Sequence, residues 1–294
     1  DKGFKTAGAC GKQALTMCMG LGCGAVGVTG ARIIDSPRER LIAIITNSFV
    51  PCNGRFPAII AIATMFLTTG GRFASLQSAL IMTAAIAFSV LMTLLVSRLL
   101  SKTVLKGVPA SFTLELPPYR IPRVGKVLLH SVLDITLVVL GRAAAVAVPA
   151  GIVIWACSNI YIGEETVLKT AASVLNPFAK LFGMDGNVLC GFILALPANE
   201  IALPIMAMGY SGGALAEISS LSETAALFAA NGFGTVNALC TLVFILFHWP
   251  CATTILTVWK ETKSLKWTVL SVAVPLFTGL FLCFLINMTA KLFI

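Results

Sequence analysis

Long uncharged apolar segments run through this sequence and limit what it can fold into. Segments 76–96, 143–162 and 267–290 contain no charged residue, and each is close to the roughly 20 residues that a helix needs to cross a bilayer core of about 30 Å. Only 11% of the 294 residues are charged and the mean hydropathy is +0.94, whereas soluble domains carry about 25% charged residues. The sequence therefore excludes a soluble globular domain. It predicts an all-α polytopic membrane protein whose first partner is the lipid bilayer.

Further apolar segments contain internal breaks: 13–31, 41–69, 186–216 and 224–259. The last is far too long for one straight crossing at about 1.5 Å per residue, so we expect it to start after 231–234 and to break again near Pro250. Glycine and proline are common in membrane helices, which is the simplest reading of any single break. Broken helices at membrane depth survive only inside protein or beside water, and several together are typical of a transporter's substrate site.

The few charged residues predict which loops share a side of the membrane. Segments 97–130 and 260–266 are rich in Lys and Arg, which predicts that both are cytoplasmic. Segment 163–185 contains more acidic than basic residues and is expected outside. This arrangement requires an odd number of crossings between the outer segment and the second basic one. We therefore expect residues 186–209 to form a re-entrant hairpin from the outside and residues 13–31 to form one from the cytoplasm.

The two halves of the chain would then repeat in opposite orientation, with broken or re-entrant helices in each. A weak sequence match supports this, because Pro51-Cys52 in the first broken crossing has a counterpart in Pro250-Cys251 in the second. We expect a first module at 1–97, a basic cytoplasmic loop with an amphipathic connector at 98–142, and a second module with the final transmembrane helix at 143–294. The chain begins with Asp1, and we expect the first module to be incomplete at its N-terminus.

Cysteines at the breaks are candidate metal ligands. Cys23 lies in a glycine-rich segment, and Cys52 and Cys251 directly follow prolines, so their thiols could coordinate a soft or borderline cation. Buried cysteine is otherwise a small apolar residue. We expect that packing role for the other six: Cys10, Cys18, Cys157, Cys190, Cys240 and Cys283. Nine cysteines, an odd number mostly within apolar runs, do not form a disulfide framework.

Glu200 is the single charged residue of segment 186–216. A carboxylate at membrane depth is costly and marks a functional site by default, so Glu200, with Asn199 beside it, could bind a cation or carry a proton. The alternative is that Glu200 faces the membrane interface or pairs with Arg142 or Arg55. His248 and Asn53 are further candidate ligands, although a single helical histidine is more often only hydrogen-bonded. Asn53 and Arg55 could instead satisfy backbone groups at the break.

Enzymatic and nucleic-acid-binding functions are not indicated. Segment 11–13, Gly-Lys-Gln, lacks the first glycine and the Ser or Thr that a phosphate-binding loop requires. No HExxH, paired CxxC or Ser/His/Asp set is recognisable in the sequence. The net charge of +9 reflects cytoplasmic loops and predicts no nucleic-acid partner.

The motifs occur together in a recognisable order. The most specific is Leu-Glu-Leu-Pro-Pro-Tyr-Arg-Ile-Pro at 114–122; the others are 22–23, 31–34, 38–41, 51–57, 197–200, 249–251, 260–262 and 265–267. Over nearly the whole chain they resemble the membrane part of the ferrous iron transport protein B (FeoB) family of prokaryotic inner-membrane transporters. Two positions depart from the family pattern. Segment 22–26 reads Gly-Cys-Gly-Ala-Val where many members have Gly-Cys-Asn-Val-Pro, so a break there must come from glycine, and Asn199 replaces a lysine common in the family.

The resemblance implies two gate (nucleoside-recognition-like) modules and a multi-pass protein of the prokaryotic inner membrane. It also implies Fe2+ as the transported substrate, with Cys23, Cys52 and Cys251 lining the path. We add Glu200, Asn53 and His248 as candidate metal ligands and expect neither a resident cofactor nor enzymatic activity in this chain. Expected partners are a GTP-binding G domain upstream, which would hold GTP and Mg2+, a small cytoplasmic protein of the same transport system, and further copies of the chain in a homo-oligomer.

Two other functions stay open on the sequence alone. One is a carrier for nucleosides or another small solute, with polar contacts from Asn199, Glu200 and Asn53. The other is a membrane module that serves assembly and transports nothing, in which the cysteines only pack.

Overall fold

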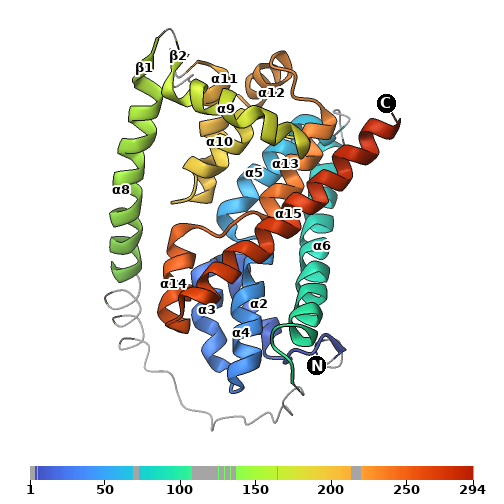
Figure 1. Ribbon diagram of the computed structural model, residues 1–294, viewed down its shortest axis with the longest axis vertical. Helices are drawn as coiled ribbons and strands as arrows, with labels where there is room; N and C mark the ends of the chain where they lie inside the picture. The colour runs from blue at the N-terminus through green and yellow to red at the C-terminus, as the bar shows by residue number, and fades with distance from the viewer. Residues whose placement is uncertain are drawn as a thin grey trace.

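The computed structural model describes residues 4, 6–68, 73–107, 125, 129, 133, 137–163, 165–212 and 220–293. The motif at 114–122 lies outside the described residues. The α-helices are α2 Gln13–Gly22, α3 Gly24–Gly30, α4 Pro37–Thr46, α5 Phe56–Ile62, α6 Ala74–Lys102, α8 Leu137–Asn159, α9 Val167–Leu181, α10 Gly186–Leu194, α11 Ala202–Tyr210, α12 Leu221–Ala230, α13 Thr235–Phe247, α14 Ala252–Thr262 and α15 Leu265–Phe293 (Figure 1). Short helical turns are η1 Ala31–Ile33, η2 Asn47–Phe49, η3 Asn53–Arg55, the π-helical η4 Ala63–Leu67, and η6 Asn199–Ile201.

The predicted all-α membrane fold is confirmed. Among the described residues, four stretches of helix are long and apolar enough to cross a bilayer: Pro37–Leu67, Ala74–Lys102, Thr235–Thr262 and Leu265–Leu292. Helix α8 covers most of the predicted segment 143–162, but its apolar part, Ala144–Asn159, is shorter than these four. The described strands form one small antiparallel ribbon, in which β1 (Tyr161–Ile162) pairs with β2 (Glu165–Thr166).

The long helices place the charged segments at opposite ends of the molecule. The C-terminal end of α6, the C-terminal end of α14 and the start of α15 lie at one end, while the β-ribbon and α9 lie at the other (Figure 1). The described parts of the two basic segments therefore share an end, as their charge predicted. The chain's C-terminus lies toward the opposite end (Figure 1). Which end faces the cytoplasm stays a prediction from the charges.

Two crossings are broken near their middle, where the sequence predicted. Helix α4 ends at Thr46, and the chain passes through η2, extended residues at 50–52 and η3 before α5 begins. Helix α13 ends at Phe247, and α14 begins at Ala252 after extended backbone at His248 and Cys251. The predicted interruption at 231–234 is also present, because it separates α12 from α13.

Arg55 joins the two breaks. Its Nη1 donates to the carbonyls of Ser48 (3.2 Å) and Leu246 (2.8 Å), and its Nη2 donates to those of His248 (3.3 Å) and Trp249 (3.2 Å). The side chain is 3% exposed. A planar guanidinium can reach several acceptors at once, and carbonyl groups that leave a helix inside a membrane protein need internal donors. The expected role of Arg55 in satisfying broken backbone is confirmed.

Two hairpins of short helices reach toward these breaks from opposite ends (Figure 1). Helices α2 and α3 pack together and are separated only by Cys23, whose backbone is extended. Helices α10 and α11 also pack together and are joined through residues 195–201. Helices of 7 to 10 residues span only about 10 to 15 Å at 1.5 Å per residue, too little to cross a bilayer. Both predicted hairpins are therefore present, and glycine breaks the first without proline. The inverted relation of two whole modules stays a prediction.

We expect Arg55→Met to lower the free energy of unfolding by at least about 3 kcal/mol, since each buried carbonyl left without a donor costs about 1–3 kcal/mol. Arg55→Lys should have an intermediate effect, because an ammonium lacks the planar fork of donors. Thermal unfolding of the full-length protein in detergent measures both. Arg98→Met, at an exposed position of α6, is the matched control; equal stability of Arg55→Met and Arg98→Met would contradict the bridging role.

Candidate functional site

The breaks of the two crossings meet the tips of both hairpins inside the molecule. The Ala252 N–H donates to the Leu196 carbonyl (2.8 Å), which ties the second break to the α10–α11 tip. Asn47 in η2 donates through Nδ2 to the Gly24 carbonyl (2.9 Å), which ties the first break to the α2–α3 tip. The short turns η3 and η6 also pack against each other. Four interruptions far apart in the sequence are thus brought together, and the candidate residues lie on them.

Glu200 and Cys52 approach the same point from two different breaks. A Cβ placed on Gly54 would lie 2.7 Å from Glu200 Oε2 and 4.0 Å from Cys52 Sγ, so a side chain at position 54 would displace the carboxylate. Within the described part of the chain, Glu200 is exposed and makes no hydrogen bond or ion pair. The alternative pairing of Glu200 with Arg55 is not formed, because the Nη atoms of Arg55 donate to backbone carbonyls. A carboxylate without a partner and a thiol therefore lie at one place.

Cys251 forms a second group with a threonine that the sequence analysis missed, close to the segment that carries Cys23. Cys251 Sγ lies 3.2 Å from Thr254 Oγ1, and a Cβ on Gly24, the residue after Cys23, would lie 2.9 Å from that hydroxyl. The signal in the sequence was the spacing of three between Cys251 and Thr254, which places both on one face at the start of a helix. Both Cys52 and Cys251 lie within electrostatic range of Arg55, which connects this group to the first.

His248 joins the second break to the tip of the α10–α11 hairpin. The ring is 2% exposed. Its Nδ1 lies 3.1 Å and 3.0 Å from the Phe244 and Ile245 carbonyls, and its Nε2 lies 3.3 Å from Asn199 Oδ1. Asn199 directly precedes Glu200. This arrangement links the ring to the hairpin tip, and a neutral imidazole can donate from only one of its two nitrogens.

The cysteines follow the predicted division by exposure only in part. Cys23 is exposed and Cys52 and Cys251 are partly exposed, whereas Cys10, Cys190, Cys240 and Cys283 are buried, as expected for packing. Cys18 and Cys157 are accessible but lie outside the two groups. Asn53, beside Cys52, has an exposed side chain. No three His, Cys, Asp or Glu side chains among the described residues gather closely enough to hold a metal ion.

Comparisons with known proteins agree with the resemblance in sequence. The family model for the C terminus of ferrous iron transport protein B matches residues 82–134, and the Gate model, described as nucleoside recognition, matches residues 140–265. A Fe(2+) transporter FeoB of Staphylococcus aureus strain COL is 29% identical over 100% of this chain and 43% of its own length. One of Methanocaldococcus jannaschii is 25% identical over 96% of this chain and 42% of its own length.

A third relative, from Porphyromonas gingivalis, is a fusion of Fe(2+) transport protein A with Fe(2+) transporter FeoB and is 22% identical over 92% of this chain and 37% of its own length. The chain thus spans less than half the length of these relatives. No solved structure matches it. Two matching family domains, full-length coverage by FeoB transporters and four helices able to cross a bilayer lead to one assignment. The chain carries the C-terminal domain of ferrous iron transport protein B and a Gate domain, and it is a multi-pass membrane protein.

Proposed function

We propose that this chain forms the pathway by which Fe2+ crosses the membrane inward. The observation that carries the proposal is the Glu200 carboxylate, which has no partner in the described residues and lies beside the Cys52 thiol where four chain interruptions meet. A carboxylate at membrane depth is retained only where something offsets its cost. A passing cation does so, and the relatives that this chain resembles are named Fe(2+) transporters.

We propose two successive stations. Glu200 and Cys52, with Asn53 beside them, form the first, and Cys251 with Thr254 and Cys23 forms the second. Fe2+ is a borderline ion that accepts thiolate, carboxylate and neutral oxygen ligands. Conduction needs binding sites that are weak enough to release the ion, and a station with few protein ligands suits that requirement.

The positive charge of Arg55, within electrostatic range of both Cys52 and Cys251, would weaken cation binding at both stations. His248 was a candidate ligand, but in this proposal it positions Glu200 through Asn199. Nucleotide hydrolysis is assigned to a GTP-binding domain of the complete protein and not to this chain. The small cytoplasmic partner is proposed to resemble the transport protein A portion of the Porphyromonas gingivalis relative.

We expect Glu200→Gln and Cys52→Ser each to lower Fe2+ uptake by about tenfold or more. Losing a contact to a charged group costs about 1.5–3 kcal/mol, and every 1.4 kcal/mol is about tenfold. Uptake of radioactive iron by cells that express equal amounts of the full-length variants measures the effect. Cys18→Ser and Glu165→Gln are matched controls, because both side chains lie outside the stations. Wild-type uptake by the Glu200→Gln, Cys52→Ser double variant would reject this pathway.

The supporting role of His248 predicts that His248→Phe and Asn199→Ala have similar, non-additive effects. Each substitution removes the contact between His248 and Asn199 and lowers the free energy of unfolding by about 1–3 kcal/mol. Each also raises the apparent KM for Fe2+, because the hairpin tip that carries Glu200 becomes more mobile. A double-mutant cycle on KM, with hydrogen exchange of residues 195–201 as a second readout, measures the coupling. A much larger loss of uptake in His248→Phe than in Asn199→Ala would instead identify the imidazole as a metal ligand.

A further inference from the structure

Helices α3 and α14 both start at a cysteine of the second station and run side by side away from it. Cys23 precedes α3 and Cys251 precedes α14. The first turns touch where Gly24 meets Thr254, and the far ends touch where Arg32 in η1 meets Glu261. These helices are therefore parallel. They lead from the second station to the end of the molecule at which α6 terminates (Figure 1).

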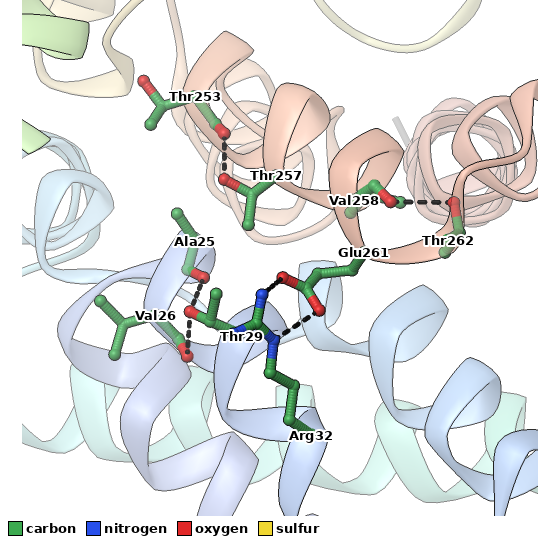
Figure 2. Close-up of polar contacts among 9 residues, drawn as sticks. All are labelled: Ala25, Val26, Thr29, Arg32, Thr253, Thr257, Val258, Glu261 and Thr262. Carbon is green, nitrogen blue, oxygen red and sulfur yellow. Dashed lines mark hydrogen bonds and ion pairs between the residues drawn. The ribbon is translucent and has the colours of Figure 1, made fainter.

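The interface between these two helices is closed. Val258 on α14 and Val28 on α3 are both 0% exposed and belong to one apolar cluster with Ala31. The threonine hydroxyls drawn in Figure 2 donate to carbonyls of their own helix, as Thr29 does to Ala25 and Thr262 does to Val258. Of the contacts drawn in Figure 2, only those between Arg32 and Glu261 cross from one segment to the other.

The Arg32–Glu261 ion pair is bidentate and unequally exposed. Arg32 Nε lies 2.8 Å from Glu261 Oε2, and Nη2 lies 2.6 Å from Oε1. The Arg32 side chain is 68% exposed and that of Glu261 is 11% exposed. The guanidinium therefore faces water, whereas the carboxylate is mostly covered, in part by Arg32 itself. Glu261 gains exposure when Arg32 leaves, and a cation that takes the place of Arg32 would again neutralise the carboxylate.

Deprotonation of Arg32 does not open the pair. The hydrogen bonds to Glu261 raise the pKa of Arg32 above its ordinary value, and arginine stays charged throughout the physiological range. Exchange of one cation for another at Glu261 is then the simplest way to separate the two helices.

We propose that Glu261 is a cation-binding group at the exit of the pathway and that Arg32 closes this exit until a departing divalent cation displaces its guanidinium from Glu261. The displacement releases α3 from α14 and opens the apolar contact at Val28 and Val258. This inference rests on the proposed function, because it needs the cation to arrive from the station at Cys23 and Cys251.

Neutral variants distinguish a gate from a fixed support. For a gate, Arg32→Gln leaves Fe2+ uptake equal to or above the wild-type rate, whereas Glu261→Gln, which removes the exit ligand, lowers uptake about tenfold, the equivalent of about 1.4 kcal/mol. The reversed pair Arg32→Glu, Glu261→Arg does not restore uptake, because its carboxylate is no longer at the enclosed position. Equal losses in the two single variants together with recovery in the reversed pair would show a structural support and overturn the proposal.

A second measurement needs no variant. Phenylglyoxal modifies free guanidinium groups, and mass spectrometry of the full-length wild-type protein under anaerobic conditions quantifies its attachment to Arg32. We expect Fe2+ to increase this modification in a saturable manner. Asp35→Asn is the control, since it breaks the exposed Lys12–Asp35 pair and should leave uptake and Arg32 modification unchanged.

The two proposals fail in different ways. Normal wild-type uptake with no Fe2+ effect on Arg32 modification would reject the gate and leave the pathway intact. No wild-type uptake, together with Fe2+-dependent modification that Glu261→Gln abolishes, would reject the transport function and keep the cation site.

Discussion

The structure depends on one buried guanidinium. Each broken crossing leaves carbonyl groups without partners in a region where lipid cannot supply donors. Arg55, which belongs to the first break, donates to carbonyls of both breaks, so the second break depends on a donor from the first. This shared donor holds the two crossings at one depth. It also brings Cys52 and Cys251, which follow the two breaking prolines, within electrostatic range of the same charge.

The two hairpins add further hydrogen bonds to the breaks that Arg55 connects. Short helices that cannot cross a bilayer are stable here because their tips bond to the broken crossings, through Leu196 to Ala252 and through Asn47 to Gly24. The same contacts place Glu200 and Cys23 next to the breaks. Structural satisfaction of the backbone and placement of the candidate ligands are therefore two results of one set of hydrogen bonds. This is the reason that the proposed stations lie at the breaks and not along the intact helices.

Several features were predictable from local chemistry. Uncharged runs identified the helices, and proline and glycine located the breaks at 51–57, at 231–234 and near Pro250, since these residues interrupt helical hydrogen bonding wherever they occur. Helix ends were less accurate: α6 continues to Lys102, past the predicted end at residue 96. Long basic side chains can extend toward polar surroundings while their backbone stays helical, so the first charge does not end a helix.

The sequence by itself determined that this protein lies in a lipid bilayer and is helical. It also located the helix breaks and a short set of candidate ligands, because composition and backbone chemistry act locally. Only the tertiary structure decided which groups meet. In the structure, Arg55 donates to four carbonyls and does not pair with Glu200, and His248 contacts Asn199. Thr254 lies beside Cys251, and Arg32 pairs with Glu261, which is distant in sequence. These choices depend on contacts between segments distant in sequence, where several partners of equal chemistry compete and only packing selects among them.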